Sequence, residues 1–398
     1  MERRRGEGSR SDPEGATATS SASRRRFLAA LGTGGIFATA GCLGGASSRL
    51  PFVDRESNST PSPPREPSVA ETYRDVELPV PESELARGAP KDTIAAITEP
   101  AFGPDWSGIE EHLSDGSLVI GVERDGAARA YPLKLLNWHE VVNDDFGGPL
   151  LVSYCPLCAS GVVADRTMDG EALTFGVSGL LWRADLVMYD EATGSLWSQL
   201  LARAIRGELT GANLALYPST TTTWGQWREA HPGTEVLLPP PDSNTVRGRL
   251  NLSYHRNPYL GYETSRRIGV GRTEEIDERL HPKTRVIGVA HDGVARAYTL
   301  QTLAKEGVVN DTVGGLPVVV SMASTTMVAY VRRIGGRTLG FDREDDVLIG
   351  GGSRWDIVSG RALDGPFEGR TLEPANVRSP MFWFAWADFY PDSEIYGQ

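Results

Sequence analysis

Short apolar runs followed by turn residues mark the globular part of this chain. Val119–Val122 leads into Asp125-Gly126 and then into Ala127–Tyr131, where polar and apolar positions alternate. Two strand-like segments around an Asp-Gly turn predict a β-hairpin. The continuous apolar runs Leu150–Ser153 and Val318–Ser321 have the length of buried strands.

Helical patterns are few and short. Residues 132–140 begin with proline, which suits the first turn of a helix. Trp224–Ala230 and Trp383–Phe389 also have helical patterns. These short helices among many strand signals predict a β-rich α+β fold.

The globular part contains an internal sequence repeat. Residues 119–131 recur as residues 286–298, with ten of thirteen positions identical at an offset of 167. Trp197 matches Trp355 at an offset of only 158, so the first copy is nine residues longer between Asp144 and Trp197. We therefore expect two tandem copies of one internally duplicated unit, and we expect residues shared by both copies to stabilise the fold.

Composition changes divide the chain into five predicted segments. They are a signal peptide (1–41), a disordered tether rich in Pro and Ser (42–88), a first repeat (89–240), a linker (241–272) and a second repeat (273–398). A tether of this kind buries too little apolar surface to offset its chain entropy.

The N-terminus has the pattern of an export signal with a lipid anchor. Arg24 and Arg25 precede Phe27-Leu28, as in a twin-arginine signal, and the apolar run up to Ala40 is too short to span a bilayer. Thr-Ala-Gly before Cys42 resembles a lipobox. We expect a lipoprotein attached to the cell membrane through Cys42, on its extracytoplasmic face.

Charge adds information about surroundings and partners. The chain of 398 residues has a formal net charge of -12, and only four of its 40 basic residues are lysines. This balance is typical of a haloarchaeal, halophilic surface, although a GC-rich genome that favours Arg codons gives the same bias. No basic stripe opposes the negative field, so we expect no nucleic-acid partner.

Cys155-Pro156-Leu157-Cys158 lies inside the interval where the first copy is longer. The second copy lacks both cysteines, and it has Glu306 and Gly307 in place of His139 and Glu140. The second copy therefore lacks the cysteines, the histidine and the glutamate together.

Three interpretations of the two cysteines remain open. Cys155 and Cys158 could bind Zn, Cu or Fe with His139 as the third ligand, and His231 or His255 as weaker candidates. They could form a thiol–disulfide couple of an oxidoreductase. However, residues 159–165 have the pattern of a turn and strand rather than the long helix of a thioredoxin fold. They could also form a structural disulfide in an exported protein.

Other polar residues in the first copy are candidates for a pocket. They are Glu140, Ser178, Asp185, Asp190 and Gln199. A hydrogen-bonded hairpin explains the last four equally well. The chain has no dinucleotide fingerprint or phosphate-binding loop, and Gly-x-Ser-Gly at 176–179 lacks the spacing of a hydrolase nucleophile.

Several motifs together resemble one family. They are Trp-His-Glu-Val-Val-Asn-Asp at 138–144, Tyr-Cys-Pro-Leu-Cys at 154–158, Phe-Gly-Val-Ser-Gly-Leu at 175–180, Ser-Leu-Trp-Ser-Gln at 195–199, Asn-Pro-Tyr-Leu-Gly-Tyr at 257–262 and Arg-Leu-His-Pro-Lys-Thr-Arg-Val at 279–286. The likeness is to domain of unknown function 3179 and extends over about residues 90–398. It implies an exported or envelope-bound protein of bacteria or archaea, with no assigned activity.

Overall fold

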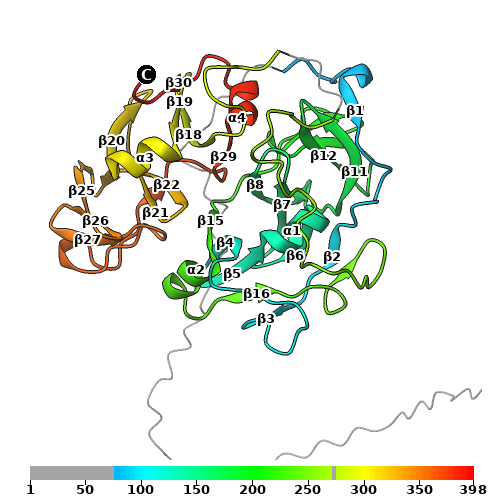
Figure 1. Ribbon diagram of the computed structural model, residues 1–398, viewed down its shortest axis with the longest axis horizontal. Helices are drawn as coiled ribbons and strands as arrows, with labels where there is room; N and C mark the ends of the chain where they lie inside the picture. The colour runs from blue at the N-terminus through cyan, green and yellow to red at the C-terminus, as the bar shows by residue number, and fades with distance from the viewer. Residues whose placement is uncertain (1–75, 271–274) are drawn as a thin grey trace, which may run out of the picture. The chain divides into compact units, whose positions relative to one another are not determined.

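Strands dominate the folded chain, as its short apolar runs predict. The computed structural model describes residues 76–270 and 275–398 (Figure 1). Within these ranges the α-helices are seven residues long: α1 (Leu133–His139), α2 (Trp224–Ala230), α3 (Leu300–Glu306) and α4 (Trp383–Phe389). The β-rich α+β class is therefore confirmed. None of the helices in the described residues is long and apolar enough to cross a membrane.

Three five-stranded sheets and one small hairpin form the first half of the described chain. One sheet has the order β15 (Thr220–Thr223), β4 (Leu118–Arg124), β5 (Ala127–Pro132), β16 (Glu235–Leu237), β3 (Phe102–Gly103). The second has the order β17 (Asn244–Thr245), β2 (Ile97–Glu99), β6 (Val141–Asp145), β7 (Pro149–Cys155), β8 (Ser160–Asp165). The third has the order β1 (Leu85–Arg87), β11 (Phe175–Trp182), β12 (Asp185–Asp190), β13 (Leu196–Ser198), β14 (Arg203–Arg206), and the hairpin is β9 (Thr167–Met168) with β10 (Glu171–Ala172).

The second half uses a similar set of smaller sheets. One has the order β29 (Met381–Phe382), β18 (Arg285–His291), β19 (Val294–Thr299), β30 (Glu394–Ile395). The next has the order β20 (Val308–Val313), β21 (Leu316–Ala323), β22 (Thr326–Val331), β28 (Glu373–Pro374). The last has the order β25 (Phe341–Glu344), β26 (Val347–Gly350), β27 (Ser353–Asp356), and the hairpin is β23 (Arg333–Ile334) with β24 (Arg337–Thr338). Two 3-10 turns, η1 (Glu82–Glu84) and η2 (Gly365–Phe367), complete the elements.

Equivalent side chains make equivalent contacts in the two halves. Tyr131 on β5 donates a hydrogen bond to Asp144 on β6 (2.6 Å), and Arg129 pairs with the same carboxylate (2.9 Å). Tyr298 and Arg296 contact Asp311 in the same way, at 2.7 and 2.6 Å. Each group ties the predicted hairpin to the neighbouring sheet, so these shared residues have a structural role.

Most of the extra length of the first half lies in two places that meet. Asn143 bonds the backbone of Phe175, and Asn310 bonds the backbone of Phe341, so the two hairpins beginning there correspond. The first pairs Phe175 with Asp190 and spans sixteen residues, whereas the second pairs Phe341 with Gly350 and spans ten. The turn between β7 and β8 is also longer than the turn between β21 and β22. The extra residues are expected near Cys155, and most of them lie in the β11–β12 hairpin, whose tip contacts that cysteine.

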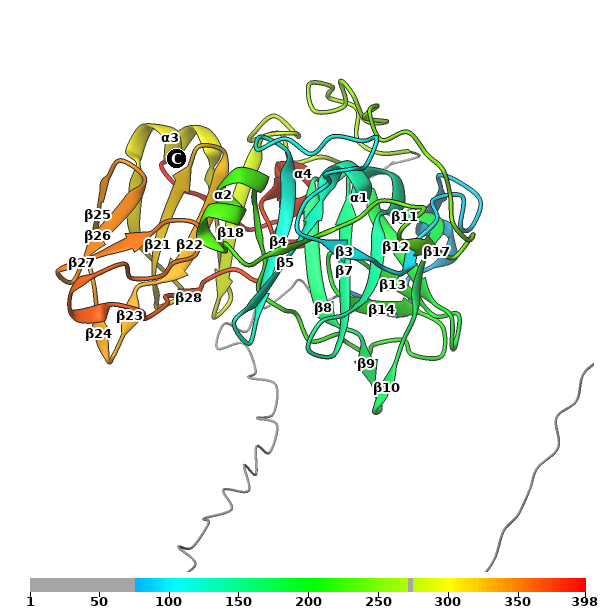
Figure 2. The ribbon, with the colours of Figure 1, turned by 90° about the horizontal axis from the view of Figure 1, so that it is seen from below.

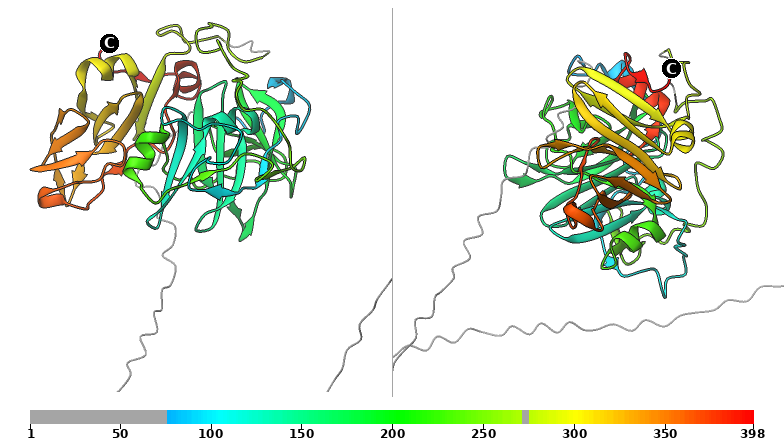
Figure 3. Two further views of the ribbon diagram at one scale, coloured as in Figure 1. Left: turned by 60° about the horizontal axis from the view of Figure 1, so that its bottom comes forward. Right: turned by 90° about the vertical axis from the view of Figure 1, so that its left-hand side faces the viewer.

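Elements of each half pack against the other half. Helix α2 and strand β15 lie beside the second half (Figures 2 and 3), where Thr326 Oγ1 donates to Thr222 Oγ1 at 2.8 Å. Strand β29 of the second half packs against the turn that holds the cysteines, because Phe382 N donates to Cys158 O at 2.9 Å. The largest buried apolar cluster accordingly contains residues of both halves, including Trp197 and Trp383.

Two predicted boundaries differ from the structure. The tether was expected to reach residue 88, but η1 and β1 lie within it, and β1 pairs with β11. The expected linker at 241–272 contains β17, and its Tyr254 is 1% exposed. In both segments a few apolar side chains among polar residues pack onto the sheets. The predicted signal peptide and most of the tether lie outside the described residues.

Candidate metal centre

The two cysteines lie at the ends of one tight turn. Strand β7 ends at Cys155, and β8 begins at Ser160, which confirms the predicted turn and strand. The backbone N–H of Cys158 is within bonding distance of Cys155 O (3.1 Å) and Cys155 Sγ (3.4 Å). Both thiols are free, and their residues are only 1% and 0% exposed. The turn therefore presents two neighbouring sulfurs to the protein interior.

A carboxyl group from another hairpin completes the cluster. Asp185 follows Arg183 and Ala184, which turn the chain with φ values of 53° and 67°. One carboxylate oxygen of Asp185 and the sulfurs of Cys155 and Cys158 all lie within 4.8 Å of one another. Zinc–sulfur bonds of about 2.3 Å and zinc–oxygen bonds of about 2 Å place two ligands of one ion within ~4.5 Å. Small side-chain adjustments would therefore let all three groups bind one ion.

Neighbouring groups orient this carboxyl. Ser198 Oγ donates to Asp185 at 2.5 Å, and Leu200 N lies 3.3 Å from both carboxyl oxygens. Burial raises the pKa of Asp185 to about 7, although these hydrogen bonds act in the opposite direction. Burial also raises the pKa of the Cys158 thiol, as does its neighbour Cys155. Hydrogen bonds of this kind fix the ligands of protein metal sites in place.

His139 is not part of the cluster, contrary to our prediction. Its Nδ1 lies 2.6 Å from Ala95 O, and its Nε2 lies 2.7 Å from the Tyr254 hydroxyl. A neutral imidazole has one donor and one acceptor nitrogen, so both are engaged. Burial lowers the pKa of His139, which favours this neutral form. Its role is to join α1 to two distant segments. Within the described residues, the group of side chains that could hold a metal ion contains Asp185 and not His139.

The other predicted histidines lie elsewhere. The His231 ring packs on Trp227 with centroids 4.0 Å apart, and His255 Nδ1 lies 3.3 Å from Glu111. Neither belongs to a group of metal-binding side chains in residues 76–270 and 275–398.

Three of the predicted pocket residues form hydrogen bonds that stabilise the hairpins. Ser178 Oγ donates to Val187 O at 2.5 Å. Asp190 accepts from Trp197 Nε1 at 2.9 Å. Gln199 binds both the hydroxyl and the carbonyl of Ser160, the first residue after the cysteine turn. These buried contacts hold the strands around the cluster, and none of the three lines the pocket described next.

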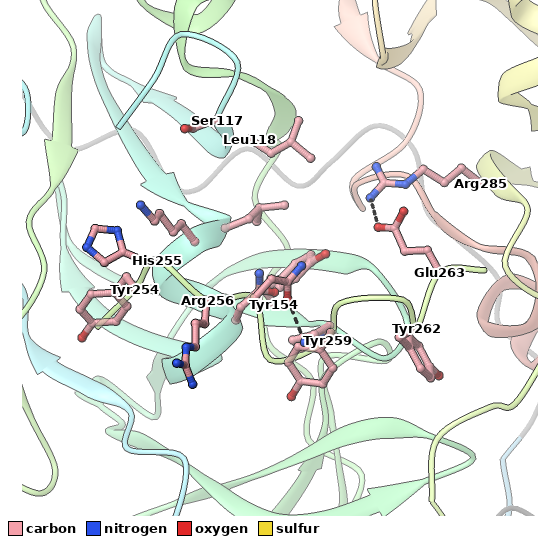
Figure 4. Close-up of a pocket in the computed structure, with 15 residues that line it drawn as sticks. Ser117, Leu118, Tyr154, Tyr254, His255, Arg256, Tyr259, Tyr262, Glu263 and Arg285 are labelled. Atoms are coloured by element: carbon pink, nitrogen blue, oxygen red, sulfur yellow. Dashed lines mark hydrogen bonds and ion pairs between the residues drawn. The ribbon is translucent and has the colours of Figure 1, made fainter. Parts of the chain in front are cut away.

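A pocket of about 310 Å³ lies next to the cysteine turn (Figure 4). Its walls come from residues 117–118, α1, the turn itself, the segment 254–263 and β18 of the second half. The lining residues are Ser117, Leu118, Leu133, Lys134, Asn137, Tyr154, Pro156, Tyr254, His255, Arg256, Asn257, Tyr259, Tyr262, Glu263 and Arg285. Tyr154 and Pro156, which flank Cys155 in the chain, line it, whereas Cys155, Cys158 and Asp185 do not.

Glu140, the remaining pocket candidate, lies behind one wall. The Tyr259 hydroxyl donates to Glu140 Oε1 at 3.1 Å. Burial raises the pKa of Glu140 to about 8, although this hydrogen bond opposes the shift. Glu140 therefore contacts the pocket through Tyr259 rather than directly.

Lys283 is a residue of this region that sequence reasoning missed. Its Nζ donates to Arg267 O at 2.7 Å, reaches Tyr262 O and Ser265 O at 3.3 Å, and lies over the Tyr262 ring. Burial lowers the pKa of Lys283 to about 8, although Cys158 and Glu263 favour its charged form. The only available signal was the rarity of lysine together with its place in the motif at 279–286.

Comparison with known families supports the resemblance seen in the motifs. The model of the family described as protein of unknown function (DUF3179) matches residues 91–393. The chain belongs to this family. Searches of curated proteins and of solved structures each gave no significant match.

Proposed function

We propose that Cys155, Cys158 and Asp185 bind a transition-metal ion in a protein tethered to the outside of the cell membrane. The observation that carries this proposal is the convergence of two thiols and one carboxyl within 4.8 Å in the interior. Two thiolates with one carboxylate suit zinc best among the predicted metals, whereas copper(I) favours sulfur ligands alone.

The surroundings of Asp185 support a bound cation. The residue is 0% exposed, and within residues 76–270 and 275–398 no Lys, Arg or His forms an ion pair with it. A buried carboxylate without a positive partner is unfavourable by several kcal/mol, roughly, so such a group is protonated, paired or bound to metal. A metal ion would supply that positive charge and would also neutralise the thiolates.

Metal analysis after purification with and without reductant tests the proposal. We expect about one equivalent of metal per chain in the wild type and its loss when Cys155→Ser and Cys158→Ser are combined. Asp185→Asn should weaken binding at least about tenfold, since a site of three protein ligands loses one. Asp190→Asn is the matched control, because it removes a buried carboxyl from the same strand but outside the cluster. A reduced wild-type protein that takes up no zinc, copper or iron contradicts the proposal.

A thiol–disulfide oxidoreductase is the alternative. The favouring observation is that Cys155 and Cys158 are free thiols at the spacing of redox motifs. Thiol exchange requires access for an attacking thiolate, and both residues are almost fully buried. Reaction of native protein with Ellman's reagent distinguishes the two, because a redox pair would be modified within minutes and a buried metal site would not. A structural disulfide would instead leave no thiols to titrate before reduction.

The proposed location rests on the sequence motifs outside the described residues. Cys42 would carry the lipid, and Arg24 and Arg25 would direct export of the folded chain. Cys42→Ser should release the protein from membranes, and replacing Arg24, Arg25 and Arg26 together by Lys should block export. A wild-type protein recovered entirely in the soluble fraction with unmodified Cys42 would disprove the anchor.

We also infer that the two halves arose by duplication. The shared order of their elements and the matching Tyr–Asp–Arg contacts support this origin. In this view the longer turn and the longer hairpin of the first half were added or kept together, because each supplies part of one site.

A further inference from the structure

The pocket beside the cysteine turn has the size of a small-molecule site. Its volume of about 310 Å³ is at the lower end of the range of roughly 300–1,000 Å³ found for ligand pockets. Five separate segments form it, and one of them, β18 with Arg285, belongs to the second half. A space built in this way depends on the full fold, unlike a shallow gap within one loop.

Positive charge is in excess around this pocket. Lys134, Arg256 and Arg285 line it, against a single carboxylate, that of Glu263. Arg285 lies 3.9 Å from Glu263, and Lys134 lies 3.2 Å from Glu111 behind the wall. Arg256 forms no ion pair among the described residues. An excess positive charge inside a chain of net charge -12 favours an anionic ligand.

Four tyrosine side chains also line the pocket, and hydrogen bonds hold three of them in place. Tyr254 OH bonds His139, Tyr259 OH bonds Glu140, and Tyr262 OH accepts from Gly269 N at 3.0 Å. Tyrosine offers a ring face for apolar contact and a hydroxyl for hydrogen bonding. Since these rings are fixed before a ligand arrives, binding would cost little conformational entropy.

We propose that this pocket binds a small organic carboxylate, with the anionic group held by Arg256 and the carbon skeleton packed against Tyr259 and Tyr262. The buried Glu140 behind Tyr259 is compatible with an anion there, because its raised pKa keeps it mainly uncharged at neutral pH. This site is separate from the proposed metal site, since none of Cys155, Cys158 and Asp185 lines it.

Titration with paired probes tests this inference. The anions are benzoate, succinate and citrate, and the neutral controls are benzamide and succinamide, with binding followed by NMR at low ionic strength. We expect at least one anion to bind about tenfold more tightly than its neutral counterpart, and Arg256→Gln to weaken it about tenfold or more. Tyr259→Phe should weaken it less, because it removes the hydroxyl but keeps the ring. Arg266→Gln is the control, since Arg266 is an exposed arginine three residues beyond the segment 254–263 and does not line the pocket.

Three outcomes would overturn the inference: no anion of the set binds, the neutral probes bind equally well, or Arg256→Gln and Arg266→Gln have the same effect. The double variant Cys155→Ser with Cys158→Ser should retain carboxylate binding. A failure of the metal proposal would therefore leave this result intact, and the reverse also holds.

Discussion

Glu140 ends helix α1 with a φ of 56°, at the position where Gly307 ends helix α3 with a φ of 75°. Glycine adopts positive φ readily, whereas a residue with a Cβ is strained there by about 1–3 kcal/mol. The first half thus has a strained, buried acid where the fold alone favours glycine. Strain of this kind is concentrated at functional sites, which agrees with the contact between Glu140 and the pocket residue Tyr259.

The raised pKa of Glu140 predicts a particular pH dependence of stability. Between its ordinary pKa of 4.5 and its folded pKa of about 8, the folded state holds a proton that the unfolded state has lost. Raising the pH through this window therefore destabilises the fold, by up to about 1.4 kcal/mol per pH unit. Glu140→Gln keeps the shape and cannot titrate, so its free energy of unfolding should fall less steeply. Urea unfolding at pH 5, 6, 7 and 8 measures the difference.

Asp185 contributes in the same direction in both proteins, so only the difference between wild type and Glu140→Gln is informative. Parallel curves for the two proteins would show that Glu140 is ionised in the folded state at neutral pH.

Two glycines should be intolerant of any side chain. A Cβ on Gly121 would lie 2.3 Å from the Trp227 ring, and one on Gly288 would lie 2.2 Å from the Trp386 ring. Gly121→Ala and Gly288→Ala should each destabilise the protein by about 1–3 kcal/mol or more, since the indole must move within a packed core. Gly233→Ala, where a Cβ meets nothing within 4 Å, is the control and should change the melting temperature little. Tolerance of alanine at 121 and 288 would contradict this packing.

His139→Ala distinguishes a structural histidine from a ligand. The change leaves Ala95 O and the Tyr254 hydroxyl without their buried partner, which should cost about 2–5 kcal/mol of stability. Metal content per folded chain should be unchanged, because the ring is not in the Cys–Cys–Asp group. Thermal unfolding and metal analysis of the same preparation give both values. Loss of metal with unchanged stability would identify His139 as a ligand after all.

Local pattern was sufficient to predict much of the fold. The Asp-Gly turn at 125–126, the apolar run at 150–153 and the Trp-rich helices each depend on residues close in the chain, and the structure has all of them. Residues shared by the two halves were correctly assigned to the fold, because Tyr131 and Tyr298 bond equivalent aspartates.

The composition of the metal cluster could not be predicted in the same way. Asp185 is distant in the chain from Cys155, and only the length of the β11–β12 hairpin brings its carboxyl to the sulfurs. His139 looked suitable because a short helix before the cysteine strand placed it nearby. Its ring direction, however, is decided by Tyr254, which lies 115 residues further along the chain. Sequence spacing limits which residues can meet, whereas packing across the sheets selects among them.

Lys283 should hold residues 262–267 in place and so limit access to Cys158. Its ammonium group is the shared donor for the carbonyls of Tyr262, Ser265 and Arg267, and Lys283 is 5% exposed. Lys283→Met keeps the length and apolar stem but removes all three hydrogen bonds, each worth about 1–3 kcal/mol when a charged donor is lost. We therefore expect faster hydrogen exchange in residues 262–267 and faster alkylation of Cys158 by iodoacetamide.

Lys305→Met is the matched control, since Lys305 is an exposed lysine on α3. Its exchange and alkylation rates should equal those of the wild type. If Lys283→Met also leaves both rates unchanged, the segment is held by its tyrosine contacts rather than by the lysine. If it accelerates exchange without accelerating alkylation, the segment is loosened but does not guard the sulfurs, and access to Cys158 must then be limited by strand β29, which bonds the Cys158 carbonyl from the other side.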